Sequence, residues 1–177
     1  MQKSSDKNTD TAALAAQKLG DALLLRNMYL SSAESCTGGL IAAAMTEISG
    51  SSRWFERGYI TYSNAAKQQD LQVHPDTLEQ FGAVSEETAM AMASGALNAS
   101  PNAHIAIATT GIAGPTGETP GKPIGMVCFG FARRRQQGEG IVAHAHTEVF
   151  SGSRQDVRAA ATLFALEHAL DLLSVPR

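Results

Sequence analysis

The sequence predicts an α/β fold, with one mixed, mostly parallel sheet of about five strands and helices on both of its faces. Short segments rich in β-forming residues alternate with segments in which apolar residues recur at helical spacing. Two strand-like segments, 124–131 and 141–150, are separated by a short polar stretch, which is typical of an antiparallel hairpin. No repeat or linker interrupts this order, so we expect one domain at 10–177 after a flexible tail at 1–9.

Cap residues and apolar periodicity define the elements of the first half. The expected elements are a helix capped by Asp10 or Thr11, a buried strand ending at 27–30, a helix at about 37–48, a strand at 59–62 and a helical turn capped by Ser63 or Asn64. The glycine and serines at 50–52 break the second of these helices.

The second half of the sequence contains clearer signals for where helices begin and end. The expected elements are a short helix from Pro75 to Gly82, a helix capped by Ser85, a buried strand at 103–109, a long loop at 110–125, the two hairpin strands and a last helix to about 173 that starts at a capping box of Ser153 and Asp156. The loop is too long for a hairpin turn, and loops of that length are usually functional.

Composition narrows the class of function. Of the 177 residues, 44% are hydrophobic and 18% are charged, as in an ordinary globular protein. The formal net charge of -3 gives no electrostatic reason to expect nucleic acid, and no apolar run approaches the roughly 20 residues of a membrane helix. The start of the chain lacks the hydrophobic region of a signal peptide, and two cysteines, Cys36 and Cys128, indicate a reducing compartment. We therefore expect a cytoplasmic protein without a nucleic-acid or membrane partner.

Ser35 begins a Ser-Cys-Thr-Gly-Gly turn at 35–39, between the first strand and the following helix. This position exposes a hydroxyl, the glycine pair lets a ligand approach the backbone, and the first N–H groups of the helix face any bound anion. Ser35 is either an acyl-transfer nucleophile or an ordinary helix N-cap. Cys36 is a rival nucleophile whose pKa a helix N-terminus would lower, although packing as a small hydrophobe is the preferred interpretation.

Lys67 follows the strand at 59–62 closely enough for a helical turn from Asn64 to bring its amine over the carboxyl end of the sheet. A lysine acts as a general base only when it is neutral. Lowering its pKa from about 10.4 to about 7.5 takes about 4 kcal/mol from burial or a nearby cation. From the residues alone, a surface lysine is the preferred interpretation.

Three further groups allow a functional and a simpler interpretation. The loop at 110–125 either closes over a substrate and offers N–H donors, or is a mobile surface loop. Arg154, in the first turn of the last helix, either grips a phosphate or is solvated. His144 and His146 face the same side of their strand beside Glu148, where a metal site is conceivable but a solvated strand face is preferred.

Six segments together resemble the CinA C-terminal domain family. They are 33–39 (AESCTGG), 54–58 (WFERG), 61–64 (TYSN), Lys67, 82–85 (GAVS) and 110–115 (TGIAGP). The combination is specific although no single segment is, and the resemblance covers about residues 10–173. Longer members of the family carry a further N-terminal domain, whose activities do not transfer to this chain.

The resemblance implies a three-layer α/β/α sandwich that hydrolyses the carboxamide of nicotinamide mononucleotide to nicotinic acid mononucleotide and ammonia, in pyridine nucleotide recycling. It implies Ser35 as the nucleophile, Lys67 as its base and Tyr62 as an aid to proton transfer, without a cofactor or metal. A homodimer or higher homo-oligomer is also implied. The expected substrate-binding residues are Glu34, Thr37, Gly38, Gly39, Thr109, Thr110, Gly111, Gly114 and Arg154.

The substrate's phosphate needs a cationic or N–H-rich site, and a helix N-terminus with Arg154 is the expected place. Oxyanion donors are expected near 37–39 or at Gly111. Two alternatives stay open: a catalytically silent nucleotide-binding or partner-binding module of the same fold, and Cys36 as the nucleophile. Retention of the complete predicted catalytic set argues against the silent module.

Overall fold

The structure of the protein is a computed structural model that describes residues 3–135 and 140–174, and the side chains of 11–135 and 140–173. Its elements, in chain order, are α1 (Lys3–Leu25), β1 (Leu30–Glu34), α2 (Leu40–Thr46), the 3-10 turn η1 (Ser51–Arg53), β2 (Phe55–Ile60), α3 (Asn64–Leu71), α4 (Pro75–Phe81), α5 (Glu86–Ala99), β3 (Ile105–Gly111), β4 (Met126–Arg134), β5 (Ile141–Val149) and α6 (Arg154–Ser174).

The five strands form one mixed sheet in the order β2-β1-β3-β4-β5. Strand β1 runs parallel to β2 and β3, whereas β3–β4 and β4–β5 are antiparallel. The predicted mixed sheet and its antiparallel hairpin are confirmed, but parallel and antiparallel pairs are equal in number rather than mostly parallel. The helical connections that parallel strands need end at β3, and the later strands are joined by loops. The predicted tip residues 136–138 lie outside the described residues.

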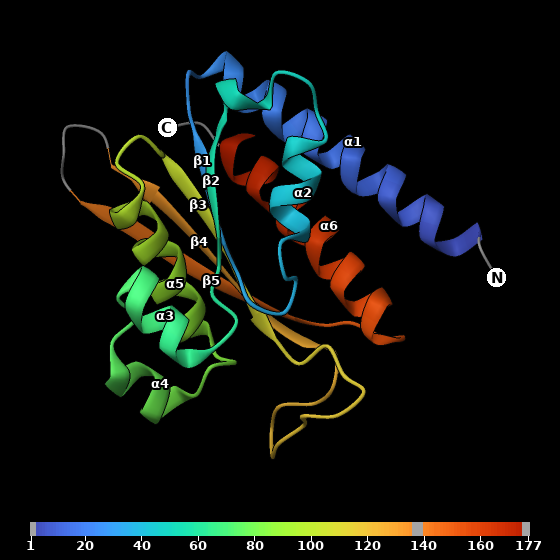
Figure 1. Cartoon of the computed structure of the whole chain (residues 1–177), viewed down its shortest axis with the longest axis vertical. Helices are drawn as coiled ribbons and strands as arrows, with labels where there is room; N and C mark the ends of the chain where they lie inside the picture. The colour runs from blue at the N-terminus through green and yellow to red at the C-terminus, as the bar shows by residue number, and fades with distance from the viewer. Residues whose placement is uncertain (1–2, 136–139, 175–177) are drawn as a thin grey trace.

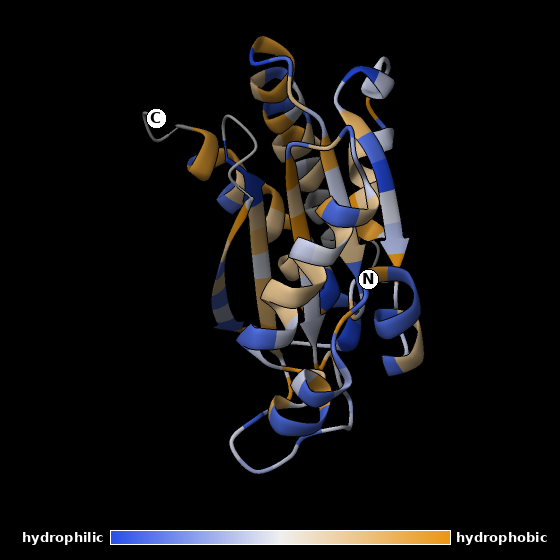
Figure 2. Ribbon diagram, turned by 90° about the vertical axis from the view of Figure 1, so that its left-hand side faces the viewer, coloured by the Kyte–Doolittle hydropathy of each residue, from blue (hydrophilic) through white to orange (hydrophobic). Residues whose placement is uncertain are grey.

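Helices cover both faces of this sheet, as predicted. Figure 1 shows α1, α2 and α6 on one face and α3, α4 and α5 on the other. Each face has its own apolar core, one beneath α1, α2 and α6 and one beneath α3, α4 and α5. In Figure 2 the apolar residues gather on the strands and the inner turns of the helices, while hydrophilic residues mark many outward turns. Burial of these two apolar faces is the main stabilising contribution to the fold.

The first helix begins earlier than the sequence predicts. Helix α1 starts at Lys3, so residues 3–9 belong to it and the predicted start at Asp10 or Thr11 is wrong. Residues 3–19 contain no proline or glycine, and a helix that packs through Ala15, Ala16 and Leu19 gains one hydrogen bond for each residue added in front. The polar composition of 3–9 gave no sign of this extension.

Helix caps are the best-predicted details. The hydroxyls of Ser63 and Ser85 accept hydrogen bonds from Ala66 N and Thr88 N, as expected for N-caps. At the start of α6, Ser153 N and Oγ donate to the Asp156 carboxylate in the predicted capping box. The second strand is displaced: β2 covers Phe55–Ile60, not 59–62, because its register with β1 begins at Phe55.

The three parallel strands bring their carboxyl ends to one edge of the sheet. Glu34, the last residue of β1, lies opposite Ile60 of β2 and Thr109 of β3. In α/β sheets, ligands bind outside this edge. The turn that follows β1 therefore emerges beside the ends of its two neighbours.

Candidate active site

A row of polar side chains crosses the carboxyl edge of the sheet. The ladder continues one residue past the strands, because Ser35 N donates to Thr109 O and Thr61 N donates to Glu34 O, both at 2.9 Å. Ser35 is thereby placed between Thr61 and Thr110. The register of β3, β4 and β5 extends the row, which reads Thr61, Ser35, Thr110, Cys128 and Thr147. The last three lie in β3, β4 and β5, whereas Thr61 and Ser35 lie one residue past the ends of β2 and β1.

The row faces the α3–α5 side of the sheet. Side chains alternate between the faces of a strand. Ala33 and Ala108, two residues before Ser35 and Thr110, lie in the core beneath α5. The Ser35 hydroxyl therefore points toward the layer that contains α3, whose second turn carries Lys67.

Lys67 and Ser35 meet in this layer. The Lys67 amine lies 3.2 Å from Ser35 Oγ, 3.0 Å from the Thr61 carbonyl and 3.3 Å from the Tyr62 carbonyl. Lys67 is 1% exposed and Ser35 is 8% exposed. The interpretation of Lys67 as a surface residue is wrong. It lies four residues before the buried Leu71, on the same face of α3, and this i, i+4 spacing is a signal that predicts its burial.

Burial lowers the pKa of Lys67 from its ordinary value, because the charged form loses hydration. Three oxygen atoms surround Nζ: an ammonium would donate to all three, whereas a neutral amine donates to two and keeps its lone pair for the third. Carbonyl oxygens can only accept, so those of Thr61 and Tyr62 take the two hydrogens of the neutral amine. The nitrogen lone pair is then directed at the Ser35 hydroxyl, which is the arrangement a general base requires.

The turn after Ser35 is not helical. Gly38 and Gly39 both have positive φ angles, 60° and 97°, and α2 begins at Leu40 with Gly39 as its N-cap. The predicted start of this helix at 37 is therefore wrong, and Ser35 is not an N-cap of α2. The glycine pair reverses the chain between the strand and the helix, in a conformation that other residues rarely adopt.

Glu34 occupies the N-terminus of α2 with its own carboxylate. The side chain is fully buried and both of its oxygens accept hydrogen bonds. The donors are Ser32 Oγ, Thr37 Oγ1, Gly39 N, Ile41 N and Ala42 N, at 2.8 to 3.2 Å. The expectation that the first N–H groups of this helix are free for an anion is wrong, because a protein carboxylate already binds them. Substrate contact by Glu34 stays a prediction.

Cys36 packs as a small hydrophobe, as preferred. The side chain is 6% exposed, and loss of hydration raises the pKa of its thiol to about 12. Because the thiolate is the nucleophilic form, this environment is unsuited to a reactive cysteine. Beside it, Thr37 Oγ1 and Thr109 Oγ1 share a hydrogen bond of 2.7 Å and tie the turn to the end of β3. Thr110 Oγ1 donates to Ala83 O at 2.6 Å and so ties β3 to the segment before α5.

Arg154 joins three parts of the site. Its guanidinium donates to Gly114 O at 2.9 Å and to the Tyr62 hydroxyl at 3.1 Å. Tyr62 is 61% exposed, and it touches Lys67 through its backbone carbonyl rather than through its ring. A part for its hydroxyl in proton transfer stays a prediction.

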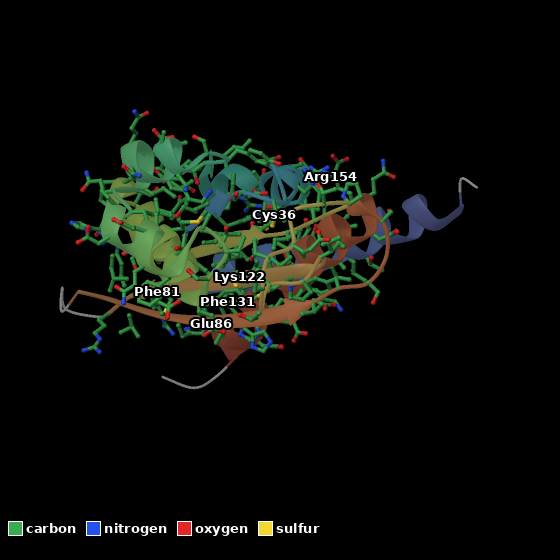
Figure 3. All side chains as sticks on the ribbon, turned by 90° about the horizontal axis from the view of Figure 1, so that it is seen from below. Cys36, Phe81, Glu86, Lys122, Phe131 and Arg154 are labelled. Atoms are coloured by element: carbon green, nitrogen blue, oxygen red, sulfur yellow. The ribbon has the colours of Figure 1, made fainter. Side chains whose placement is uncertain are left out.

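The loop that the sequence placed at 110–125 is tied down rather than mobile. Lys122 N and Thr119 N exchange hydrogen bonds with each other's carbonyls, and Gly125 N donates to Ile112 O at 2.7 Å. The Lys122 ammonium donates to the carbonyl of Phe81, the last residue of α4, at 2.7 Å. Figure 3 looks onto this edge of the sheet and shows Arg154 and Lys122 on opposite sides of Cys36 in that view.

Comparison with known proteins identifies the family. The family model described as the CinA C-terminal domain matches residues 12–173. The chain belongs to the CinA C-terminal domain family. Its segments AESCTGG and TGIAGP, on which the resemblance was based, form the turn and the loop described above.

Similar proteins include relatives with an assigned name and proteins whose crystal structures have been solved. A nicotinamide-nucleotide amidohydrolase, PncC, from Enterobacter agglomerans is 50% identical over 153 residues, which are 86% of this chain and 90% of that protein. The protein of the same name from Escherichia coli strain K12 is 49% identical over 152 residues, 86% and 88% of the two chains. The crystal structure of the competence damage-inducible protein A from Klebsiella pneumoniae subsp. pneumoniae has a TM-score of 0.86 and 34% identity, and covers 94% of this chain and 99% of that chain.

One residue of this CinA-family site was missed from the sequence. Arg158, on α6, donates through Nε to Cys36 O at 3.1 Å and through Nη2 to Thr37 O at 2.9 Å. It lies four residues after Arg154, and this spacing places both guanidinium groups on one face of α6. That spacing is the signal from which Arg158 could have been found.

The histidines of β5 are partly solvated, as preferred: His144 is exposed, and the side chains of His146 and Glu148 are 41% and 42% exposed. His144 stacks on Phe131, and His146 stacks on Phe164 of α6 and accepts or donates a hydrogen bond of 2.7 Å with Glu148. Among the described residues, no group of three or more His, Cys, Asp or Glu side chains is arranged to hold a metal ion. No helix in the described part of this CinA-family chain is long and apolar enough to span a membrane.

Proposed function

We propose that the protein is a nicotinamide-nucleotide amidohydrolase, which converts nicotinamide mononucleotide to nicotinic acid mononucleotide and ammonia. The observation that carries the proposal is the buried Lys67 amine, 3.2 Å from Ser35 Oγ and directed by two carbonyl oxygens. The names and high identity of the two PncC relatives support the choice of substrate. A module that merely binds a nucleotide has no use for an uncharged amine beside a hydroxyl.

The reaction follows from these two groups. Neutral Lys67 removes the hydroxyl proton of Ser35 while Oγ attacks the carboxamide carbon, and a tetrahedral oxyanion forms. When it collapses, the C–N bond breaks, the leaving nitrogen takes the proton from Lys67, and ammonia departs from an ester on Ser35. Water then attacks the ester carbon, and Lys67 transfers the water proton to Ser35 Oγ as the acid is released.

The structure narrows the choice of oxyanion donors. Gly38 N already donates to Ser35 O, and Gly39 N already donates to Glu34. The amides of Thr37 and Gly111 remain as the predicted donors, and one such donor contributes on the order of 3 kcal/mol to the stability of the transition state. The pyridinium charge of the substrate further disfavours the ammonium form of Lys67.

Arg154 is the proposed phosphate ligand, because a guanidinium binds phosphate oxygens in pairs. The proposed pocket also includes Thr109, Thr110 and Gly114, which the hydrogen bonds described above bring to the same edge of the sheet. A homodimer and a cytoplasmic location stay predictions.

Ammonia release from nicotinamide mononucleotide tests the proposal, with free nicotinamide as the comparison. We expect turnover of the mononucleotide by the wild type and a loss of about 10⁴-fold or more in Ser35→Ala, because the nucleophile is removed. Cys36→Ala is the matched control and keeps its activity, since the Cys36 thiol is buried and protonated. Binding of the mononucleotide without turnover by the wild type would favour the silent module. Full activity of Ser35→Ala together with an inactive Cys36→Ala would favour the cysteine.

A further inference from the structure

The turn that carries Ser35 is held from α6 by Arg158. The guanidinium donates Nε–H to the Cys36 carbonyl at 3.1 Å and Nη2–H to the Thr37 carbonyl at 2.9 Å. These are the carbonyls of the two residues that follow the proposed nucleophile. Cys36 and Thr37 are 122 and 121 positions away from Arg158 in the chain, so the contact is purely tertiary.

These carbonyls depend on a side-chain donor. The positive φ angles of Gly38 and Gly39 keep the turn out of the helix, so the ordinary i to i+4 partners do not form there. Thr37 O also accepts a long hydrogen bond from Leu40 N, at 3.4 Å. Both residues are buried, and a buried carbonyl without a donor costs about 1–3 kcal/mol. Arg158 donates to both carbonyls from one rigid, planar group.

Holding the carbonyls also orients the amides. A trans peptide group is planar, so its C=O and N–H point in opposite directions. With the Cys36 and Thr37 carbonyls turned to Arg158, the N–H groups of Thr37 and Gly38 face away from α6. The Gly38 N–H then donates to Ser35 O at 3.1 Å, which closes the turn on the nucleophile itself.

Glu34 holds the same turn from its other end. Its carboxylate binds backbone N–H groups at Gly39, Ile41 and Ala42, whereas Arg158 binds backbone carbonyls at Cys36 and Thr37. The Glu34 carboxylate thus accepts hydrogen bonds from the N–H groups of this short segment, and the Arg158 guanidinium donates to its carbonyls. The position of Ser35 depends on both.

We propose that Arg158 is a positioning residue of the amidohydrolase reaction, which fixes the 36–38 peptide groups so that Ser35 Oγ and the Thr37 amide stay aligned with Lys67. This role rests on the proposed function. Arg158 acts through the turn and not on the substrate, so it controls the chemical step and leaves substrate binding nearly unchanged.

Kinetics of Arg158→Lys test the role, because lysine keeps the charge but cannot make both bonds in the same geometry. We expect kcat to fall by about 10²-fold while KM changes by less than about threefold, since a misplaced nucleophile costs rate rather than affinity. Arg26→Lys is the matched control. Arg26 also bridges two carbonyls, those of Ala22 and Leu173, at the other end of α6. We expect its kcat and KM to equal those of the wild type.

Alkylation of Cys36 measures the hold on the turn without any substrate. In a Cys128→Ala background, Cys36 is the remaining thiol, and it reacts slowly with iodoacetamide while the turn keeps it buried. We expect Arg158→Lys to raise the alkylation rate at least about tenfold and Arg26→Lys to leave it unchanged. Both rates are measured without denaturant, at a temperature well below the melting point of either variant. This readout keeps its meaning if the wild type proves not to hydrolyse nicotinamide mononucleotide.

Three results would overturn the role of Arg158. One is an unchanged kcat in Arg158→Lys when the wild type is active, and another is an unchanged alkylation rate of Cys36. The third is an equal rise of that rate in Arg26→Lys, which would indicate general loosening of α6. An inactive wild type with the expected alkylation pattern rejects the amidohydrolase function while it leaves the hold of Arg158 on the turn intact.

Discussion

At the scale of single residues, the protonation of Lys67 governs the reaction. Its amine is buried among two carbonyls and one hydroxyl, and burial lowers its pKa from the ordinary value. A buried amine with a lowered pKa destabilises the folded state at every pH at which the same amine is protonated in the unfolded chain. The fold nevertheless keeps Lys67 buried. Such a position is typical of a group retained for chemistry.

The rate of ammonia release should therefore rise with pH through the lowered pKa of Lys67 and fall as the amine becomes protonated below it. We expect this limb in kcat/KM measured between about pH 6 and pH 10. Lys67→Arg should lose about 10²–10⁴-fold in kcat at every pH, because a guanidinium stays protonated and cannot act as a base. A pH-independent rate, or an active Lys67→Arg variant, would contradict a neutral lysine base.

At the scale of elements, the close packing of α5 against α3 sets the position of Lys67. A Cβ atom on Gly95 of α5 would lie 2.0 Å from the carbonyl oxygen of Leu71, the last residue of α3. That oxygen belongs to the backbone, so it can move away only if α3 moves. Because Lys67 lies one turn earlier on α3, such a movement also disturbs its contact with Ser35.

Gly95→Ala should therefore be destabilising despite the better helix propensity of alanine. Alanine gains about 1 kcal/mol over glycine within a helix, whereas overpacking costs about 1–3 kcal/mol, and a contact this short places the cost at the upper end. We expect a net loss on the order of 1–2 kcal/mol in the free energy of unfolding by urea. Ser94→Ala, at the preceding position of α5, is the control and should be neutral or slightly stabilising. Equal stability of both variants would contradict this account.

How far each element could be predicted depends on how local its signals are. The caps at Ser63, Ser85 and Ser153 involve residues within three positions, and the helices that they start were predicted correctly. The start of α2 was misplaced because it depends on the Glu34 carboxylate and the two glycines together. The turn residues allowed a helical start at 37 equally well.

At the scale of the whole molecule, the mixed sheet and its two helical layers followed from the order of the elements. The meeting of Lys67 with Ser35 did not follow from that order, and it came from the family resemblance. The interpretation from the residues alone favoured a surface lysine, because it gave no weight to the i, i+4 spacing of Lys67 and Leu71. Arg158 was missed because its acceptors are backbone carbonyls, which every residue carries, and its spacing from Arg154 places it on the same helix face without naming those acceptors.

Helix α6 contacts both the candidate active site and a cluster of histidine and phenylalanine rings. Its first turns hold the site through Arg154 and Arg158, and a later turn places His168 among the rings of β4 and β5. The His168 ring lies 6.2 Å from that of His144 and 5.5 Å from that of His146. Burial lowers the pKa of His144 and of His168, and for His168 the two neighbouring histidines lower it further, while Asp171 partly opposes this effect.

Acid should therefore weaken the fold through these histidines, separately from its effect on Lys67. A histidine whose folded pKa lies below about 6.5 takes up its proton more readily when unfolded, so the stability present above about pH 6.5 is lost as the pH falls through that value. His168→Phe keeps an aromatic ring against Phe131 and cannot be protonated. We expect its urea midpoint to fall less than that of the wild type between about pH 7.5 and pH 5.5. Part of the fall should remain, because the pKa of His104 is also lowered by burial and by Arg134.

The control for this effect is the pH–rate profile of the same variant. The limb assigned to Lys67 should be unchanged in His168→Phe, since the two groups lie on opposite faces of the sheet, one on α3 and the other on α6. An equal acid loss of stability in both proteins would show that the ring cluster does not drive it. A shifted rate profile would show instead that protonation at β5 reaches the site through α6.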